Sequence, residues 1–418
     1  MRTLYNVALL PVRVASFVFG VWPRGSPEAN LERDQRLARR LPSAPPDSLW
    51  IHGASVGEAR MVGALAGEVR RRRPRQPVVA SAVTPTGRRQ LPQPPAIDAT
   101  FFLPLDFPAV QRRAFDHVRP SMVVLVETEI WPNLLAEAAL RKIPVAIVNG
   151  RLSRKRFTRY RRLASLYAPL LSGLGAVAAA GADDAERFSS LGVPDGAIHV
   201  IGNLKFDLPP LSADLAGLRR RFGVPEGRPV VAAGSTGEGE DTLALDAFLG
   251  ARRTVPNLML ILAPRHPDRF ATAADEAVRR GLSVACVSHR RAEPGADVLL
   301  VDTIGELASL YGLAGSAFVG GSLVPVGGHN LLEPLAAGVP VLFGPYTDQV
   351  EPIAEALIHA GAGSRVDDAA ALGRRWAELA ARPDERARLS RLGAAFLAAN
   401  RGALHRAVDL VLALRDAA

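Results

Sequence analysis

The chain of 418 residues contains a single cysteine, Cys286. One thiol excludes an internal disulfide framework and a cysteine-rich zinc site, and it fits a reducing compartment. Lysine is also scarce: only Lys142, Lys155 and Lys205 occur, so that 48 of the 51 basic residues are arginine. Because arginine is so common here, a single arginine carries little information, whereas each lysine is a stronger candidate for a specific role.

Signals for several nucleotide-binding and metal-binding classes are missing as well. No glycine loop continues into Gly-Lys-Ser or Gly-Lys-Thr, and none has the clean spacing of a dinucleotide fingerprint. His52, His266 and His329 lie in three separate loops without ligand spacing, so we interpret them as hydrogen-bonding residues. We therefore predict neither a metal nor another cofactor.

The overall composition is that of a globular protein with an excess of positive charge. Hydrophobic residues make up 48% and charged residues 22%, which excludes wholesale disorder. The net charge of +10 and the pI of about 10.6 indicate an anionic partner: nucleic acid, phospholipid or a phosphorylated substrate. A coding bias towards arginine is the alternative explanation.

The N-terminus is mostly apolar over residues 4–22, close to the length of ~20 residues that a spanning helix needs. Pro11 and Arg13 interrupt it, and a central arginine costs about 2.5–3.5 kcal/mol on membrane-insertion scales. Arg2 fits a signal peptide, but no small-residue cleavage site follows. We predict that residues 1–24 form a helix in the membrane interface, followed by arginines that meet anionic lipid. The alternative is an apolar helix packed on the protein itself.

Beyond residue 48, short apolar runs alternate with stretches of helical periodicity. The expected strands are 49–52, 78–83, 100–103, 122–127, 145–149, 176–180 and 199–201 in the first half, and 230–233, 258–263, 283–287, 298–301, 317–319 and 341–343 in the second. This alternation predicts an α/β protein with two doubly wound domains, 25–206 and 207–418, joined near Pro209-Pro210.

Three glycine-containing loops leave the expected strands. They are His52–Glu58, Gly234–Glu240, and Val319–Ser322 followed by Gly327–Asn330. In parallel sheets, ligands bind at the carboxyl ends of the strands, and converging backbone N–H groups there favour a phosphate or a carboxylate. Each loop alone is more often a tight turn, but three together favour nucleotide or sugar-phosphate binding.

A series of ordered motifs carries a specific resemblance over residues 48–350. They are Trp50-Ile51-His52, Ser55-Val56-Gly57-Glu58, Thr84-Pro85-Thr86-Gly87, Glu127-Thr128-Glu129-Ile130-Trp131-Pro132-Asn133, Lys205-Phe206-Asp207, Pro264-Arg265-His266-Pro267, Asp302-Thr303-Ile304-Gly305-Glu306-Leu307, Gly320-Gly321-Ser322-Leu323-Val324 and Gly327-Gly328-His329-Asn330-Leu331-Leu332-Glu333-Pro334. In these motifs the sequence resembles the Kdo transferases, which transfer 3-deoxy-D-manno-octulosonic acid (Kdo) in lipopolysaccharide assembly.

The resemblance implies a GT-B fold, with two Rossmann-like domains facing across a cleft. It also implies an inverting, metal-independent transfer of Kdo from CMP-Kdo to the 6′-hydroxyl of a lipid A precursor (lipid IVA), at the cytoplasmic face of the inner membrane. Two positions depart from the family pattern: Gly237 stands where histidine is usual, and Ala178–Gly181 lacks a common glutamine. Contacts to the donor or acceptor are in doubt there.

Three residues of the first half are the expected catalytic groups. Glu58 at a helix start could take a proton from a sugar hydroxyl or could simply cap the helix; the resemblance implies the proton acceptor. Glu127 and Glu129 would share one face if their strand continued, and the resemblance gives Glu127 a role in supporting the transition state. Lys205 could stabilise the charge that grows on the departing CMP.

The second half supplies the expected CMP contacts. Arg265, after Pro264, could hold the phosphate by paired hydrogen bonds. By resemblance, Ile304, Gly305 and Glu306 contact CMP through backbone groups, and the segment Asn330, Leu331, Leu332 and Glu333 also lines the site. Glu333 could accept hydrogen bonds from both ribose hydroxyls, or it could be an ordinary first-turn helix acid.

Two other functions compete with this interpretation. One is a GT-B transferase that uses a UDP-sugar donor. The other is a non-catalytic RNA-binding protein, suggested by the basic runs Arg70–Arg73 and Arg151–Arg162. No RNA-binding motif or aromatic platform accompanies these runs, so no nucleic-acid partner is expected.

Overall fold

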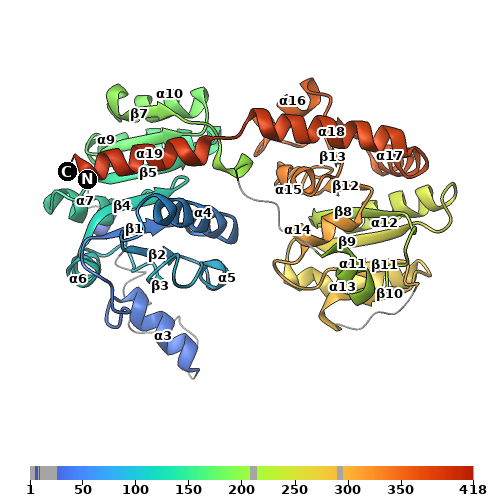
Figure 1. Cartoon of the computed structure of the whole chain (residues 1–418), viewed down its shortest axis with the longest axis horizontal. Helices are drawn as coiled ribbons and strands as arrows, with labels where there is room; N and C mark the ends of the chain where they lie inside the picture. Colours follow the sequence, from blue (N-terminus) through green and yellow to red (C-terminus); the bar gives the residue numbers. More distant parts are fainter. Residues whose placement is uncertain (1–4, 8, 10–25, 208–213, 290–294, 418) are drawn as a thin grey trace. The chain divides into compact units, whose positions relative to one another are not determined.

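The computed structural model describes residues 5–7, 9, 26–207, 214–289 and 295–417. The chain divides into two compact units, each built on a seven-stranded parallel sheet (Figure 1). One unit comprises Met1–Leu208 and Asn400–Ala418, and the other comprises Pro209–Ala399. Both have the architecture expected from the alternating pattern, with helices packed on parallel strands.

The sheet of the first unit has the order β3-β2-β1-β4-β5-β6-β7. Its strands are β1 (Ser48–His52), β2 (Val78–Ala82), β3 (Ala99–Phe102), β4 (Pro120–Val126), β5 (Val145–Gly150), β6 (Ala176–Ala179) and β7 (Ile198–Val200). The helices are α3 (Pro27–Arg36), α4 (Val56–Arg72), α5 (Pro85–Gln90), α6 (Pro108–Val118), α7 (Pro132–Leu140), α8 (Arg154–Arg162), α9 (Ala164–Leu171), α10 (Ala182–Ser190) and α19 (Ala403–Asp416), with the short 3-10 turns η2 (Asp195–Ala197) and η3 (Leu204–Phe206).

Each face of this sheet has its own hydrophobic core, because successive strand side chains point to opposite faces. Leu49 and Ile51 of β1 pack in the core that includes α4 and α19. Trp50, between them, packs in the other core, where its ring lies 5.5 Å from that of Phe101 and 5.6 Å from that of Phe115. β1 is therefore buried on both sides, as expected of a central parallel strand.

The C-terminal helix α19 corrects the expected domain division, which gave residues 207–418 to one domain. Ala407, Val408 and Val411 of α19 are buried in the core of the first unit. Asp207 accepts hydrogen bonds at the start of the helix from the N–H groups of Gly402 (2.6 Å) and Leu404 (2.8 Å). The apolar stripe of the helix therefore returns residues 400–418 to the first unit.

The sheet of the second unit has the order β10-β11-β9-β8-β12-β13-β14. Its strands are β8 (Val230–Thr236), β9 (Met259–Pro264), β10 (Val284–Cys286), β11 (Val298–Leu300), β12 (Ser316–Val319), β13 (Val341–Phe343) and β14 (Gly363–Arg365). The helices are α11 (Leu215–Arg221), α12 (Glu240–Arg252), α13 (Phe270–Arg279), α14 (Leu307–Leu310), α15 (Leu332–Ala336), α16 (Glu351–His359), α17 (Ala369–Ala381) and α18 (Pro383–Ala399), with 3-10 turns η4 (Pro267–Arg269), η5 (Val287–His289) and η6 (Tyr311–Leu313). The strand β14 was not expected from the sequence.

Most of the N-terminal segment 1–24 lies outside the described residues, as does the expected linker Pro209-Pro210. Two described residues of the N-terminal segment contact later parts of the first unit: the Tyr5 hydroxyl donates to Asp106 Oδ2 (2.9 Å), and Asn6 Oδ1 accepts from Asn133 Nδ2 (2.7 Å). Among the helices that the structure describes, none combines the length and the apolarity needed to cross a bilayer.

Candidate active site

Glu58 lies in the first turn of α4, directly after β1. The Ser55 side chain accepts the N–H of Glu58 (3.4 Å), while Glu58 Oε2 accepts the N–H groups of Ala54 and Ser55, the latter at 3.3 Å. The Ser55 hydroxyl also donates to Glu58 Oε1 (3.2 Å). This is a capping box, so the capping role considered for Glu58 is present in the structure and fixes the position of its carboxylate.

The pKa of the Glu58 carboxyl is raised above its ordinary value. Burial is the main cause, and the negative charges of Glu127 and Glu129 add to it, while hydrogen bonds from the backbone of Ala54 and Ser55 oppose the shift. The carboxylates of Glu127 and Glu129, from the loop after β4, therefore lie within electrostatic range of Glu58 at the start of α4. A glutamate with a raised pKa is a stronger base than an exposed one.

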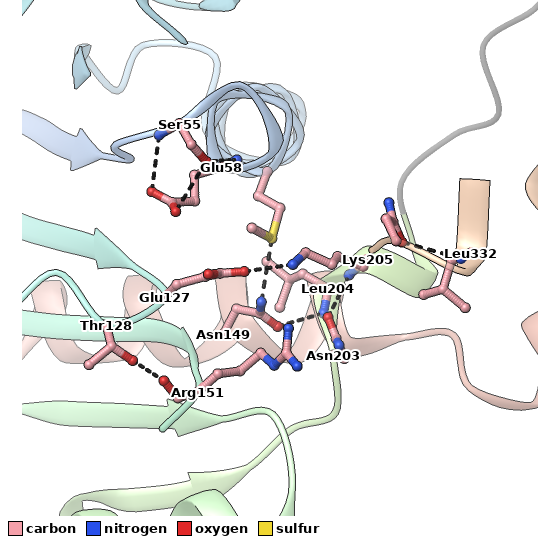
Figure 2. A network of polar contacts seen from close by, with 12 residues as sticks. Ser55, Glu58, Glu127, Thr128, Asn149, Arg151, Asn203, Leu204, Lys205 and Leu332 are labelled. Carbon is pink, nitrogen blue, oxygen red and sulfur yellow. Dashed lines mark hydrogen bonds and ion pairs between the residues drawn. The ribbon is translucent and has the colours of Figure 1, made fainter. Parts of the chain in front are cut away.

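Glu127 follows directly after β4, where the chain turns sharply. Its φ of 61° lies in the left-handed region, and its N–H donates to Val148 O (2.8 Å). Its Oε1 accepts a hydrogen bond from Lys205 Nζ at 2.8 Å (Figure 2). Burial raises the pKa of Glu127, but the charge of Lys205 and those of Arg151 and Arg156 outweigh it, so the net pKa is lowered. Glu127 is therefore a stable anion beside Glu58.

Lys205 is held in place by two asparagines. Asn203 Oδ1 accepts the N–H of Lys205 (3.0 Å), and Asn149 Oδ1 accepts the N–H of Leu204 (2.9 Å) (Figure 2). Asn149 is fully buried at the end of β5, with a φ of 57°. Sequence reasoning missed Asn149 as a site residue, although an asparagine before Gly150 at a strand end is a recognisable signal for left-handed backbone.

Glu129 lies beside a buried histidine. Glu127 and Glu129 were expected to share one face if β4 continued through Glu129. The strand instead ends at Val126, and the turn at Glu127 redirects the chain. Glu129 Oε2 accepts from Trp131 Nε1 (3.2 Å) and lies 3.8 Å from His52 Nε2. His52 Nδ1 lies within hydrogen-bond distance of Ser81 Oγ (2.9 Å) and O (3.0 Å), in line with its expected hydrogen-bonding role. Within the described ranges, no group of three or more His, Cys, Asp and Glu side chains could hold a metal ion.

All nine expected CMP contacts belong to the second unit. Pro264 ends β9, and Arg265 follows with its N–H bonded to Thr236 O (3.0 Å) and its side chain exposed. Burial lowers the pKa of the His329 imidazole, and the charge of Arg265 lowers it further, so Arg265 and His329 lie close enough to interact. The loops after β8, β9 and β12 therefore meet at one edge of the sheet.

Glu240 organises these loops and was not identified from the sequence. Its side chain is fully buried at the start of α12. Its carboxylate accepts N–H groups from both glycine loops: Gly237 (2.7 Å) on one side, and Gly321, Ser322 (2.9 Å) and Leu323 (2.8 Å) on the other. The two glycine loops are thus joined by a single buried anion. The acidic residue ending the motif Gly237-Glu238-Gly239-Glu240 was the available signal.

The segment Asn330–Glu333 forms a compact turn into α15. Asn330 Nδ2 donates to Glu333 Oε1 (3.2 Å), and Asn330 Oδ1 accepts the N–H of Leu332 (3.2 Å). The side chains of Leu331 and Leu332 are buried, so these two residues present only backbone groups to a ligand.

The loop Ile304–Glu306 follows β11. Ile304 is 53% exposed, and Gly305 has a φ of 99°, which favours glycine. The Glu306 carboxylate is engaged by Arg221 Nη2 (3.1 Å) and by the Thr303 hydroxyl. Because these contacts use the Glu306 side chain, they leave the backbone of the loop for the expected contact with CMP.

Comparison with known proteins identifies the family. Residues 31–208 match the family model of 3-Deoxy-D-manno-octulosonic-acid transferase (kdotransferase). The chain is 35% identical over 395 residues to a 3-deoxy-D-manno-octulosonic acid transferase of Haemophilus influenzae, covering 90% of this chain and 91% of that protein. It is 36% identical over 394 residues to the enzyme of the same name from Bordetella pertussis, covering 90% and 89%.

Similar solved structures support the fold. A glycosyltransferase from Rickettsia africae superposes with a TM-score of 0.61 at 13% identity, covering 88% of this chain and 98% of that one. Anabaena HepE in complex with UDP-glucose superposes with a TM-score of 0.59 at 15% identity, covering 88% and 99%. The expected GT-B fold is thereby confirmed, and the chain is a glycosyltransferase that belongs to the 3-deoxy-D-manno-octulosonic acid transferase family.

Proposed function

We propose that this enzyme transfers Kdo from CMP-Kdo to the 6′-hydroxyl of a lipid A precursor, lipid IVA, by an inverting mechanism that uses no metal. The observation that carries the proposal is the arrangement of two carboxylates near Lys205. Glu58 is held in the capping box at the start of α4, and its pKa is raised, whereas Glu127 is paired with the Lys205 ammonium at 2.8 Å, and its pKa is lowered. Two carboxyl groups whose pKa values differ in this way can take different roles: one can exchange a proton, and the other remains charged.

In the proposed reaction, Glu58 removes the proton of the acceptor hydroxyl as its oxygen attacks the anomeric carbon of Kdo. The bond from that carbon to the CMP phosphate breaks with its electron pair on the phosphate oxygen, so that one displacement inverts the anomeric centre. Lys205 supplies a cation for the developing negative charge. Glu127 holds the Lys205 ammonium in position through the 2.8 Å contact.

In the second unit, we propose that the residues at the carboxyl edge of the sheet bind the CMP-Kdo donor. Arg265 has an exposed guanidinium next to a strand end, which suits a forked contact to the single phosphate of CMP. Asn330 and Glu333 offer polar groups for the ribose, and the backbone of Ile304–Glu306 is proposed to contact the cytosine.

The acceptor is a lipid, so we propose that the enzyme works at the cytoplasmic face of the inner membrane. Residues 1–24 and the arginines that follow would provide the contact with the anionic surface. This part of the proposal rests on the apolar sequence of the segment and on the nature of the acceptor.

A donor screen tests the proposal against the UDP-sugar alternative. Purified enzyme is incubated with the lipid acceptor and either CMP-Kdo or a set of UDP-sugars, and the released nucleotide is measured by chromatography. We expect acceptor-dependent release of CMP. Release of UDP would indicate that the enzyme uses a UDP-sugar donor. Tight RNA binding at high salt without any sugar transfer would indicate that the protein binds RNA and is not a transferase.

A further inference from the structure

The first unit contains two runs of basic residues, of which one is paired with acidic side chains and the other is not. In the run that ends α4, each arginine has an acidic partner: Arg70 pairs with Asp98, Arg71 and Arg72 with Glu68, and Arg73 with Asp416. Helix α8 has the sequence Arg-Lys-Arg-Phe-Thr-Arg-Tyr-Arg-Arg, with six basic residues and no acidic one. Among the described residues, none of these six side chains forms an ion pair.

The faces of α8 have different environments. Tyr160 is buried and packs edge-on against Tyr167 of α9, with ring centres 4.7 Å apart. Arg156 and Arg159, three residues apart, share the side of the helix next to Tyr160, and the Arg159 guanidinium lies 5.7 Å from the Tyr160 ring centre. Arg154 and Arg161, seven residues apart, share the opposite side of the helix.

Arg156 lies within electrostatic range of Glu127. Arg156 is among the cations that lower the pKa of Glu127. Burial raises the pKa of Tyr160, with Arg159 and Arg156 opposing and Glu129 adding to the shift. The Thr128 hydroxyl also donates to the carbonyl of Arg151, which joins the loop of Glu127 and Glu129 to the segment leading into α8 (Figure 2).

We propose that Arg156 and Arg159 form a subsite for a phosphate group of the lipid acceptor. This inference rests on the proposed function, because it assumes a phosphorylated glycolipid whose hydroxyl is brought to Glu58. Neighbouring cations repel one another, and a bound phosphate dianion removes that repulsion. Arginine forks match phosphate oxygens by paired hydrogen bonds. The subsite would orient the acceptor sugar from a fixed point near Glu127.

The test compares two double variants of equal charge change. Arg156→Gln with Arg159→Gln removes the proposed subsite, and the control, Arg154→Gln with Arg161→Gln, removes two exposed charges from the opposite side of the same helix. Initial rates are measured with CMP-Kdo in neutral detergent micelles, which excludes anionic membrane as the binding partner. The acceptor is used in two forms, with its phosphates intact and enzymatically dephosphorylated.

We expect the subsite variant to raise the KM for the phosphorylated acceptor by ~10-fold or more, with the KM for CMP-Kdo unchanged. The dephosphorylated acceptor should show little difference between the subsite variant and the wild type. The control variant, Arg154→Gln with Arg161→Gln, should keep its KM within about 3-fold of wild type for both acceptors, because two exposed charges contribute little. Arg156→Lys with Arg159→Lys should restore part of the loss, and thermal melting checks folding.

Equal KM changes for the two double variants would overturn the subsite and indicate only general attraction to charge. An equal loss with the dephosphorylated acceptor would also overturn it. If the loss appears only on vesicles of anionic lipid, α8 binds membrane headgroups and not the acceptor. If the wild-type enzyme transfers no Kdo at all, the proposed function itself fails, and the subsite fails with it.

Discussion

Replacing Glu58 with glutamine separates the two roles that the structure gives this residue. In the capping box, Glu58 Oε2 accepts the N–H groups of Ala54 and Ser55, and Oε1 accepts the Ser55 hydroxyl. A glutamine carbonyl can still accept both N–H groups, and its amide can donate to the Ser55 oxygen. We therefore expect Glu58→Gln to cost at most about 1 kcal/mol of stability.

The effect on transfer should be much larger. Glutamine cannot take the proton of the acceptor hydroxyl, and general base catalysis typically contributes ~10²–10⁴-fold in rate. We expect kcat to fall by at least ~100-fold, equivalent to about 2.7 kcal/mol of transition-state stabilisation, while CMP binding by calorimetry stays unchanged. Ser55→Ala is the matched control: it weakens the cap, lowers the melting temperature and leaves transfer within about 10-fold of wild type.

The pH dependence follows from the raised pKa of Glu58. The rate should fall on the acidic side at a pH above the ordinary glutamate value of 4.5, and this limb should vanish in Glu58→Gln. The folded state holds the Glu58 proton more tightly than the unfolded chain does, so its contribution to stability decreases as pH rises from 4.5 through the raised value. Because glutamine does not titrate, the Glu58→Gln variant should lack this pH-dependent decrease in stability. Transfer by Glu58→Gln within a few-fold of wild type would exclude Glu58 as the general base and make Glu127 or Glu129 the next candidate.

Lys205, Arg265 and the N-terminal segment should each respond differently to removal. Lys205→Ala should lower turnover more than donor affinity, because its charge acts as the phosphate departs; equal affinity loss with unchanged turnover would remove Lys205 from the transition state. Arg265→Ala should weaken CMP and CMP-Kdo binding by similar factors in calorimetry, because both share the phosphate. Deleting residues 1–24 should leave a folded, more soluble enzyme that works poorly on acceptor in vesicles, and unchanged pelleting with vesicles would contradict this.

The sheets could be predicted from the sequence to a large extent because buried parallel strands are continuous apolar runs. The run 145–149, for example, appears in the structure as β5, Val145–Gly150. β14 was missed because Gly363–Arg365 is short and only partly buried. The placement of α19 was missed because its contacts lie far away in the sequence: Asp207 is about two hundred residues away, and the core around α4 is more than three hundred residues away.

The candidate site was also predictable only in part, because some of its residues act through contacts with distant segments of the chain. The scarcity of lysine drew attention to Lys205, and its ion pair with Glu127 joins two motifs that are 78 residues apart. The supporting residues were not predictable in the same way. Asn149 and Glu240 act through backbone N–H groups of distant loops, and such contacts leave no local pattern beyond a polar residue next to glycine.

The most direct test of the proposed function is mass spectrometry of the lipid formed from CMP-Kdo and a tetraacylated lipid A precursor. The account predicts a product heavier by one or more Kdo residues, attached at the 6′ position with inverted anomeric configuration, and its near absence with Glu58→Gln. An unmodified lipid, or a lipid carrying a different sugar when UDP-sugars are supplied, would contradict the account.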